Sequence, residues 1–314
     1  SNLADAAMLS RMMVPEMERK GYNRAFAAAI TAGGSLVTPI IPPGIALIIY
    51  GLVADVSIGK MFIAGLVPGL LCAVVLMFTV YLVARKTNAK PSRESWPTGK
   101  EVVFSLGQAW PALFLIFAVV GGIRANIFTP TEAGAVAVLI VLAIGFFIYR
   151  EMRISHVVKA LGETARATAS VMLVIMASAA LGWIFSMEHA GVAVANFVTS
   201  LTENKYMFLL IINILLLTLG MFLEGNAILL ILVPLLKPVV EHFGIDPVHF
   251  GIIMIFNLSI GAFTPPVGTV MLLVCNITQV SVGNFFKQSL PLLAALLLML
   301  MLVTYIPAIS LFLV

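Results

Sequence analysis

Residues 37–44 read VTPIIPPG, and they interrupt a stretch that otherwise consists mainly of Ile, Leu, Ala and Gly. Proline removes a backbone donor and clashes with the preceding turn, which costs about 3 kcal/mol inside a helix. Residues 261–268 read GAFTPPVG and place a similar interruption in the second half of the chain. The two stretches therefore predict helices that break within the apolar regions 22–52 and 248–279.

The composition predicts an all-α polytopic membrane protein. Of the 314 residues, 61% are hydrophobic and 10% are charged, and the mean hydropathy is +1.10, whereas soluble domains carry about 25% charged residues. A bilayer core requires about 20 apolar residues per helix. Clear candidates to span it are 60–84, 102–122, 131–149, 167–187 and 290–314. Basic residues are not interleaved with stacking aromatics, so we expect no nucleic-acid partner.

Four less apolar or irregular segments complete the layout. Residues 206–243 are long enough to enter and leave the membrane, and the polar kink at 224–226 predicts a re-entrant hairpin with its tip there. Residues 188–205 predict an interfacial amphipathic helix. Residues 85–100 and 150–166 are interpreted as polar loops.

Positive charge orients this layout. The segments assigned to the cytoplasm are 1–24, 84–101, 150–166 and 280–289. Of the 18 Lys and Arg residues, those that fall outside these segments are Lys60, Arg124, Lys205 and Lys237. A bias of this kind sets the orientation of membrane proteins.

The two broken segments belong to an internal repeat. With a shift of 224 positions, Ser35 falls on Ser259, Pro42 on Pro266 and Gly44 on Gly268. The same shift places VSIG at 56–59 on VSVG at 280–283. The predicted layout crosses the membrane an odd number of times between the copies, which inverts the second one. Inverted repeats with matching Pro- and Gly-interrupted segments indicate a secondary transporter.

The physics of the bilayer explains why such a chain would break its own helices. Unwound backbone is tolerated at membrane depth only where it is buried in protein or lines a cavity. There, freed carbonyls can coordinate a small hard cation, and half-helix N-termini can face an anion. The hydroxyls of Ser35, Thr38, Ser259 and Thr264 add further oxygens. The alternative is that both segments are kinked packing helices.

The same shift makes a prediction about the start of the chain. Residues 224–226 fall on the position before Ser1 and on Ser1–Asn2. The second copy has an inbound arm at 206–223, and the first has none. We therefore expect the chain to begin at a hairpin tip and an apolar arm to precede Ser1 in a longer protein.

Three long motifs resemble one transporter family. They are PPGIALIIYGLVADVSIGKMFIAGLVPG at 42–69, GGIRANIFTPTEAGAVAV at 121–138 and GIDPVHFGIIMIFNLSIGAFTPPVG at 244–268. They resemble the large membrane subunit of TRAP transporters, the DctM-like family, over essentially the whole chain. The resemblance implies a sodium-coupled, elevator-type importer of organic acids in the bacterial inner membrane. It also implies a small four-helix membrane subunit, separate or fused, and a periplasmic substrate-binding protein.

Carried over by position, the resemblance implies Na⁺ as the coupling ion at two sites. The first site would use Ser1, Asn2, Gly34, Ser35, Thr38 and Pro42. The second would use Gly225, Asn226, Gly261, Thr264 and Pro265. The candidates for binding substrate are Ser1, Asn2, Glu224, Asn226 and Arg124.

These assignments divide the chain into functional parts. The predicted parts are a first transport-domain repeat at 1–59, scaffold helices and cytoplasmic loops at 60–166, connecting helices at 167–205, a second transport-domain repeat at 206–289 and a terminal transmembrane helix at 290–314.

Several single residues have competing interpretations. Thr129 and Glu132 fit a capping box at a helix start, which is a structural role. Arg124 either meets an anionic substrate or the binding protein, or is a snorkelling interfacial residue. Glu224 has three interpretations: it tunes a cation site, it recognises a substrate hydroxyl, or it is a solvated tip residue. The four histidines, His156, His189, His242 and His249, are interpreted as solvated or interfacial.

Other functions remain as alternatives. The sequence has no nucleophile–base pair, HExxH pattern or phosphate loop, so we do not expect an enzyme. A stand-alone sodium/carboxylate symporter of similar architecture would need no binding protein. An ion channel would conduct without saturating. The transported acid is open among C4-dicarboxylates, sialic acid and sugar acids.

Overall fold

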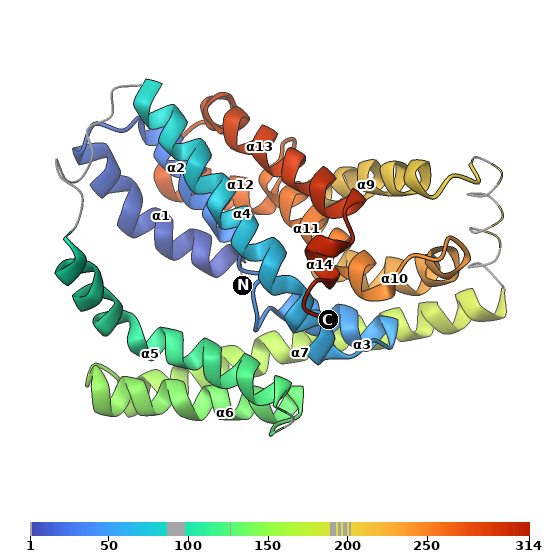
Figure 1. Ribbon diagram of the computed structural model, residues 1–314, viewed down its shortest axis with the longest axis horizontal. Helices are drawn as coiled ribbons and strands as arrows, with labels where there is room; N and C mark the ends of the chain where they lie inside the picture. The colour runs from blue at the N-terminus through green and yellow to red at the C-terminus, as the bar shows by residue number, and fades with distance from the viewer. Residues whose placement is uncertain are drawn as a thin grey trace. The chain divides into compact units, whose positions relative to one another are not determined.

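The computed structural model describes residues 2–86, 98–125, 127–188 and 202–314, together with the single residues 193, 196 and 200. The regular structure of these residues is helical throughout, and seven of their helices are long and apolar enough to cross a membrane (Figure 1). The predicted all-α polytopic membrane fold is therefore confirmed. The described residues group into two compact units, one formed by 1–92 with 184–314 and the other by 93–183.

The first half of the larger unit contains the first broken helix. Its helices are α1 (Asn2–Arg19), α2 (Arg24–Ser35), α3 (Ile45–Ala54) and α4 (Ile58–Lys86). Helix α2 begins after Asn23, whose side chain accepts a hydrogen bond from the Ala25 amide at 2.8 Å. After Ser35 the chain forms turns up to Gly44, and the Pro42–Pro43 bond is cis. The predicted break thus separates α2 from α3.

The second half of this unit contains the second broken helix. Its helices are α9 (Lys205–Phe222), α10 (Gly225–His242), α11 (Pro247–Phe263), α12 (Thr269–Thr278), α13 (Val282–Tyr305) and α14 (Ala308–Leu311). The break lies between α11 and α12, and the Pro265–Pro266 bond is cis. Glu224 caps α10, and Asp246 caps α11.

The helix bounds of the two halves correspond. A shift of 224 positions moves both ends of α3 onto those of α12, and moves the start of α4 onto the start of α13. Helix α1 contacts α12, and α10 contacts α3, so each arm that leaves a tip packs on the later half-helix of the other repeat. Helices α9 and α10 have 18 residues each, a length of about 27 Å. The re-entrant path of these two helices and the inversion of the second repeat remain predictions.

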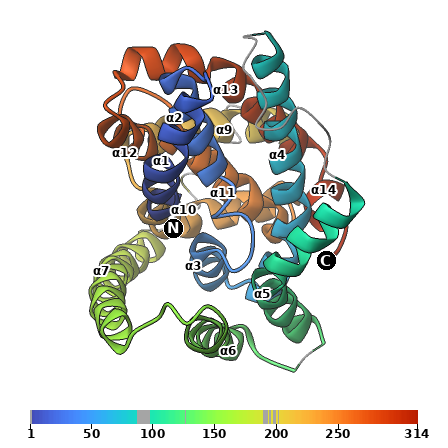
Figure 2. The same cartoon turned by 90° about the vertical axis from the view of Figure 1, so that its left-hand side faces the viewer.

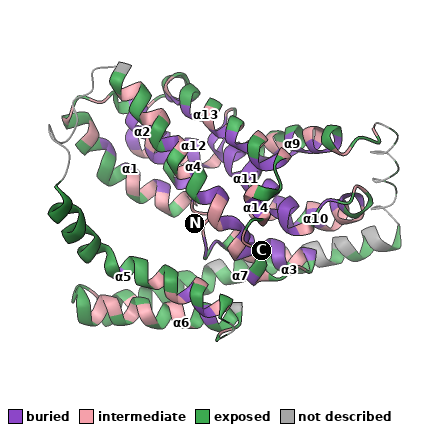
Figure 3. Ribbon diagram, viewed as in Figure 1, coloured by how far each residue is buried: buried purple, intermediate pink, exposed green. Residues whose placement is uncertain are grey.

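Helix α11 is the centre of the core of this unit. All of its residues from Val248 to Phe263 are buried (Figure 3). Figure 2 shows it in the middle of the unit with α4 along one side, and it also contacts α9, α10, α3 and α13. A helix that is buried all round has no polar face, which explains the nearly continuous apolar sequence of this segment.

The first break packs closely on α4. A Cβ atom on Gly65 would collide with the backbone oxygen of Ile40, and one on Gly69 would lie 2.5 Å from Cγ1 of Ile41. Small residues four positions apart allow a backbone to approach a helix this closely. Helix α4 also contacts α13, α3 and α11 within this unit. The predicted division into transport domain and scaffold remains a prediction.

The smaller unit exposes most of its apolar surface. It contains α5 (Gly99–Arg124), α6 (Pro130–Ala143), the π-helical turn η1 (Ile144–Ile148) and most of α7 (Ile154–Met187). Helices α5 and α6 lie side by side. The predicted capping box is confirmed, because the Thr129 amide donates to Glu132 Oε2 at 2.8 Å and the Glu132 amide donates to Thr129 Oγ1 at 3.3 Å.

Three predictions from the sequence are corrected. Residues 154–166 are not loop but the start of α7, where Lys159 and Glu163 form a pair one turn apart at 4.0 Å. The last spanning helix is α13 at Val282–Tyr305 rather than 290–314, because Ser281 caps its start and Pro307 follows its end. His249 is not solvated. It is 2% exposed, with Nδ1 2.6 Å from Ser310 Oγ, because α14 folds back over the start of α11.

The remaining predictions concern the other three histidines and the interfacial helix at 188–205. His189 and most of the predicted interfacial helix at 188–205 lie outside the described residues. His156 and His242 are exposed, as predicted.

Candidate functional site

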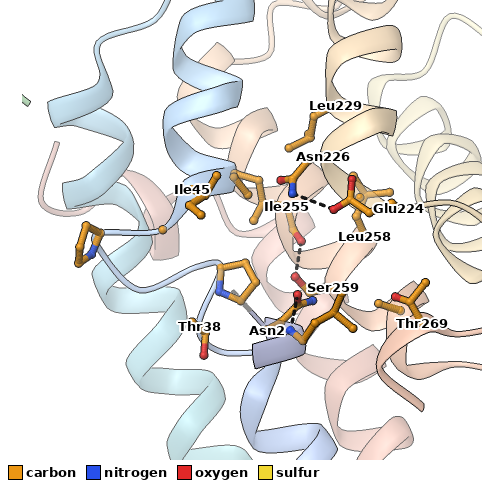
Figure 4. Close-up of a pocket in the computed structure, with 17 residues that line it drawn as sticks. Asn2, Thr38, Ile45, Glu224, Asn226, Leu229, Ile255, Leu258, Ser259 and Thr269 are labelled. Atoms are coloured by element: carbon orange, nitrogen blue, oxygen red, sulfur yellow. Dashed lines mark hydrogen bonds between the residues drawn. The ribbon is translucent and has the colours of Figure 1, made fainter. Parts of the chain in front are cut away.

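A cavity of about 220 Å³ lies between the two breaks within the larger unit (Figure 4). Among the described residues, three helices begin at its wall, and their first residues line it: Ile45 of α3, Gly225 of α10 and Thr269 of α12. Asn2 of α1 lines it as well. The first turn of a helix leaves backbone N–H groups without partners and carries partial positive charge. The cavity therefore combines several sources of positive potential.

The described side chains on the wall add no positive charge to that of the helix N-termini. Among the described lining residues, Glu224 is the single ionisable one. Its Oε2 accepts a hydrogen bond from the Ala227 amide at 2.9 Å, and its Oε1 accepts one from Asn226 Nδ2 at 2.7 Å. Figure 4 shows these two side chains together at the start of α10. An anion in this cavity would depend on helix N-termini and bound cations for its counter-charge.

Hydroxyl groups gather where α2 and α11 end. Ser35 donates to the backbone oxygen of Ala32 at 2.8 Å, and Thr264 donates to that of Ile260 at 2.7 Å. Ser259 donates in the same way to Ile255 at 2.8 Å. A hydroxyl carries one hydrogen and two acceptor lone pairs. Each of these oxygens therefore keeps lone pairs with which a hard cation could be coordinated.

The first break also carries a carboxylate that the sequence reasoning missed. Thr38 Oγ1 donates to Asp5 Oδ2 at 2.7 Å, which joins the break to the first turn of α1. Asp5 is half-buried. The sequence held one signal for this site: Asp5 is an acidic residue about one turn after the predicted hairpin tip. A carboxylate beside a hydroxyl offers hard oxygen ligands at this break.

The cavity brings together part of the first predicted cation set. Asn2 and Thr38 line it. Ser35, which is 1% exposed, and Pro42, which is buried, do not line it. Gly34 lies on an exposed part of α2, where an added Cβ would meet nothing within 4 Å. Ser1 lies outside the described residues.

The second predicted set divides in a similar way. Gly225 and Asn226 line the cavity, whereas Thr264 and Pro265 belong to the break beside it. Gly261 packs directly on the backbone of Gly220 in α9.

The substrate candidates Asn2, Glu224 and Asn226 all line the cavity. Arg124 ends α5 in the smaller unit and is exposed, so the structure does not associate it with the cavity.

Comparison with known proteins identifies the family. Residues 1–309 match the family described as "Tripartite ATP-independent periplasmic transporter, DctM component". The chain belongs to the DctM family. As a DctM component, it is the large permease subunit of a TRAP transporter, a multi-pass membrane protein and not an enzyme.

Individual relatives agree with this assignment. The chain is 39% identical to the C4-dicarboxylate TRAP transporter large permease protein DctM of Pseudomonas aeruginosa, over 99% of the chain and 72% of that protein. It is 38% identical to the sialic acid TRAP transporter large permease protein SiaM of Vibrio cholerae, over 100% of the chain and 73% of that protein. It is 37% identical to the isethionate TRAP transporter permease protein DctMQ of Oleidesulfovibrio alaskensis, over 99% of the chain and 49% of that protein.

Proposed function

We propose that this subunit imports an organic acid together with Na⁺ across the bacterial inner membrane. One observation carries the proposal. Several helix N-termini meet at a cavity whose single ionisable lining residue, among those described, is a carboxylate. Helix N-termini bind anions without a basic side chain. The cavity therefore suits a carboxylate. It should also release a carboxylate more readily than a site with a pair of arginines would.

Sodium supplies the counter-charge in this proposal. At the first break, Asp5, Thr38 and freed carbonyls would hold one ion. At the second break, Thr264 and the carbonyls after Gly261 would hold another, close to the tip at Gly225 and Asn226. The bound ions would neutralise Asp5 and Glu224 and make the cavity complementary to an anion. Transport of substrate and Na⁺ is coupled because each improves the site for the other.

The substrate class follows from the relatives. Their names specify a C4-dicarboxylate, sialic acid and isethionate, which are all organic anions. We infer an organic acid of this range, with sugar acids included, as the substrate of this chain.

The proposed partners are a small four-helix membrane subunit and a periplasmic binding protein that delivers the acid. The isethionate relative supports the first, because the chain covers 49% of it but 72% of the Pseudomonas protein. That relative thus has room for a further subunit in the same polypeptide.

The proposed mechanism is an elevator. The loaded unit with both breaks would slide against a scaffold and carry the cavity from one side of the membrane to the other. One positive charge that crosses about 100 mV contributes about 2.3 kcal/mol, before any concentration gradient is counted. Two Na⁺ ions imported with one monovalent acid would move one net positive charge inward per complete transport cycle, so the membrane potential would drive that cycle.

Uptake by proteoliposomes tests the proposal. The full transporter should accumulate a labelled acid only with an inward Na⁺ gradient and a cognate binding protein. Uptake with Na⁺ alone would favour the stand-alone symporter. A conductance that does not saturate would favour the channel. Uptake that ignores Na⁺ would contradict the coupling.

A further inference from the structure

A buried polar contact joins α9 to α11 through Asn257, which does not itself line the cavity. Asn257 of α11 is 0% exposed, and its Nδ2 lies 3.0 Å from the backbone oxygen of Asn213 and 2.7 Å from Asn213 Oδ1. Asn213 of α9 in turn donates through Nδ2 to Thr304 Oγ1 of α13 at 3.0 Å. A directed series of hydrogen bonds therefore runs from α11 through α9 to α13.

The geometry determines which end of the Asn257 amide faces α9. A backbone oxygen can only accept, so the atom beside it must be the amide nitrogen. Asn257 Oδ1 accordingly accepts no hydrogen bond from the described residues. A buried acceptor without a partner costs about 1–3 kcal/mol. An apolar side chain at 257 would remove this cost but would leave the buried Asn213 Oδ1 without its donor, so the two hydrogen bonds tie the placement of α9 to Asn257.

Two further contacts continue along the same seam toward the hairpin tip. A Cβ atom on Gly261 would lie 2.7 Å from Cα of Gly220, so the backbones of α9 and α11 touch there. One residue later, the Met221 backbone oxygen accepts a hydrogen bond from the Gly268 amide at 2.8 Å. Helix α9 is thereby held against α11 and the second break up to three residues before Glu224.

The other arm of the hairpin is held differently. Helix α10 contacts α3 and α11, and its buried side consists of Ile, Leu and Val side chains. Within the described part of the chain, no side-chain hydrogen bond joins α10 to either helix. Apolar contacts are non-directional and permit sliding at low cost.

We infer that Asn257 is a positioning residue for sodium coupling. Its two hydrogen bonds hold α9 on α11, so the tip stays beside the second break and that break keeps its Na⁺ site. When the tip opens, α10 moves and α9 stays in place. This inference rests on the proposed function, because it assigns Na⁺ to the second break.

The decisive variant is Asn257→Asp in the complete transporter. It keeps the size of the side chain, but a carboxylate cannot donate the two hydrogen bonds. Thr278→Val is a matched control, because Thr278 is a 3% exposed hydroxyl on α12 that donates to Val274 of its own helix at 2.7 Å.

The first readout is the Na⁺ concentration for half-maximal uptake. We expect at least a threefold rise in Asn257→Asp and no change in Thr278→Val, with substrate half-saturation at saturating Na⁺ unchanged in both. A loss of stability alone would reduce the maximal rate and leave the Na⁺ dependence in place. An unchanged Na⁺ dependence in Asn257→Asp overturns the inference.

The second readout does not require transport. Amide hydrogen exchange of residues 214–223 reports whether α9 is held in place. We expect at least tenfold faster exchange in Asn257→Asp than in the wild type or Thr278→Val. Thr304→Val, which removes the next acceptor in the series, should act in the same direction to a smaller extent and replaces the Asp variant should that not fold. If wild-type uptake ignores Na⁺, the proposed function fails, while unchanged exchange in α9 separately overturns the placement.

Discussion

The two repeats of the larger unit share the bounds of the half-helix after the break, α3 and α12, but attach their outbound arms with different chemistry. In the first repeat, α1 is joined to the break and to α2 by polar pairs, Thr38 with Asp5 at 2.7 Å and Ser10 with Thr31 at 3.2 Å. A shift of 224 positions maps these residues onto apolar ones, which are Ala262, Leu229, Pro234 and Ile255. The second repeat has a carboxylate at its tip, at Glu224, a position whose counterpart in the first repeat precedes Ser1. Matching backbones thus present unequal sites, so we expect the two Na⁺ sites to differ in affinity.

The largest effect should come from making the first repeat resemble the second. Asp5→Leu introduces the residue found at the corresponding position, and it removes both the charge and the acceptor of Thr38. We expect Na⁺-driven uptake to fall at least tenfold. Asp5→Asn removes the charge but keeps an acceptor for Thr38, so it separates the effect of the charge from that of the hydrogen bond.

Glu16→Gln controls for the change in charge on α1, because Glu16 lies in its exposed last turns, 3.2 Å from Lys20. If Asp5→Leu keeps the wild-type Na⁺ dependence of uptake, Asp5 is not part of the Na⁺ site.

Loss of a break hydroxyl should have a smaller effect. Thr264→Ala and Ser35→Ala each remove one oxygen whose hydrogen already goes to its own helix. We expect the half-saturating Na⁺ concentration to rise about threefold to tenfold, which corresponds to about 0.7–1.4 kcal/mol of binding free energy. Thr278→Val removes a similar hydroxyl at the last residue of α12, the end of that helix opposite the second break, and should change nothing. Unchanged Na⁺ titrations in both alanine variants would count against both sites.

Variants of Glu224 test the role of the acidic tip of the second repeat. Glu224→Gln removes the negative charge but keeps an acceptor for the Ala227 amide. At Na⁺ concentrations too low to neutralise Glu224, less repulsion should lower the substrate concentration for half-maximal uptake. Glu224→Ala should also lower the free energy of unfolding by about 1 kcal/mol, the typical cost of a lost cap. Substrate titrations measure the first effect and thermal melting measures the second. Equal melting temperatures of Glu224→Gln and Glu224→Ala would refute the capping role.

The smallest effect concerns the polar pair that the second repeat replaces with apolar residues. Ser10→Ala removes one inter-helix contact, whereas Thr31 keeps its hydrogen bond to Ala28 at 2.9 Å. We expect the free energy of unfolding to fall by about 1 kcal/mol, with the Na⁺ dependence of uptake unchanged. Thermal melting checks the first expectation. A shifted Na⁺ titration would place Ser10 in the site.

Local sequence signals were sufficient for much of the fold. The Pro- and Gly-rich stretches locate both breaks, and the shift of 224 positions matches the observed bounds of α3 and α12. The capping box at Thr129 was visible because its residues lie three apart. The shift also drew attention to Asn226 and Glu224, which line the cavity.

Contacts over long sequence separations could not be predicted in this way. Asp5 meets Thr38 across 33 positions, and Asn213 meets Asn257 across 44. No periodicity encodes such pairs, because they depend on how helices pack in three dimensions. The convergence of helix starts on one cavity was hidden for the same reason. His249 looked interfacial because the return of α14 over α11 leaves no local signal.

Equilibrium binding of radioactive ²²Na⁺ to the purified transporter tests the central claim most directly. We predict saturable binding of two ions per large subunit, with the affinity for one ion reduced by Asp5→Asn, the affinity for the other reduced by Thr264→Ala, and both reduced in the double variant. Wild-type affinity for both ions in the double variant, or no saturable binding to the wild type, would contradict the claim that the two breaks hold the coupling ions.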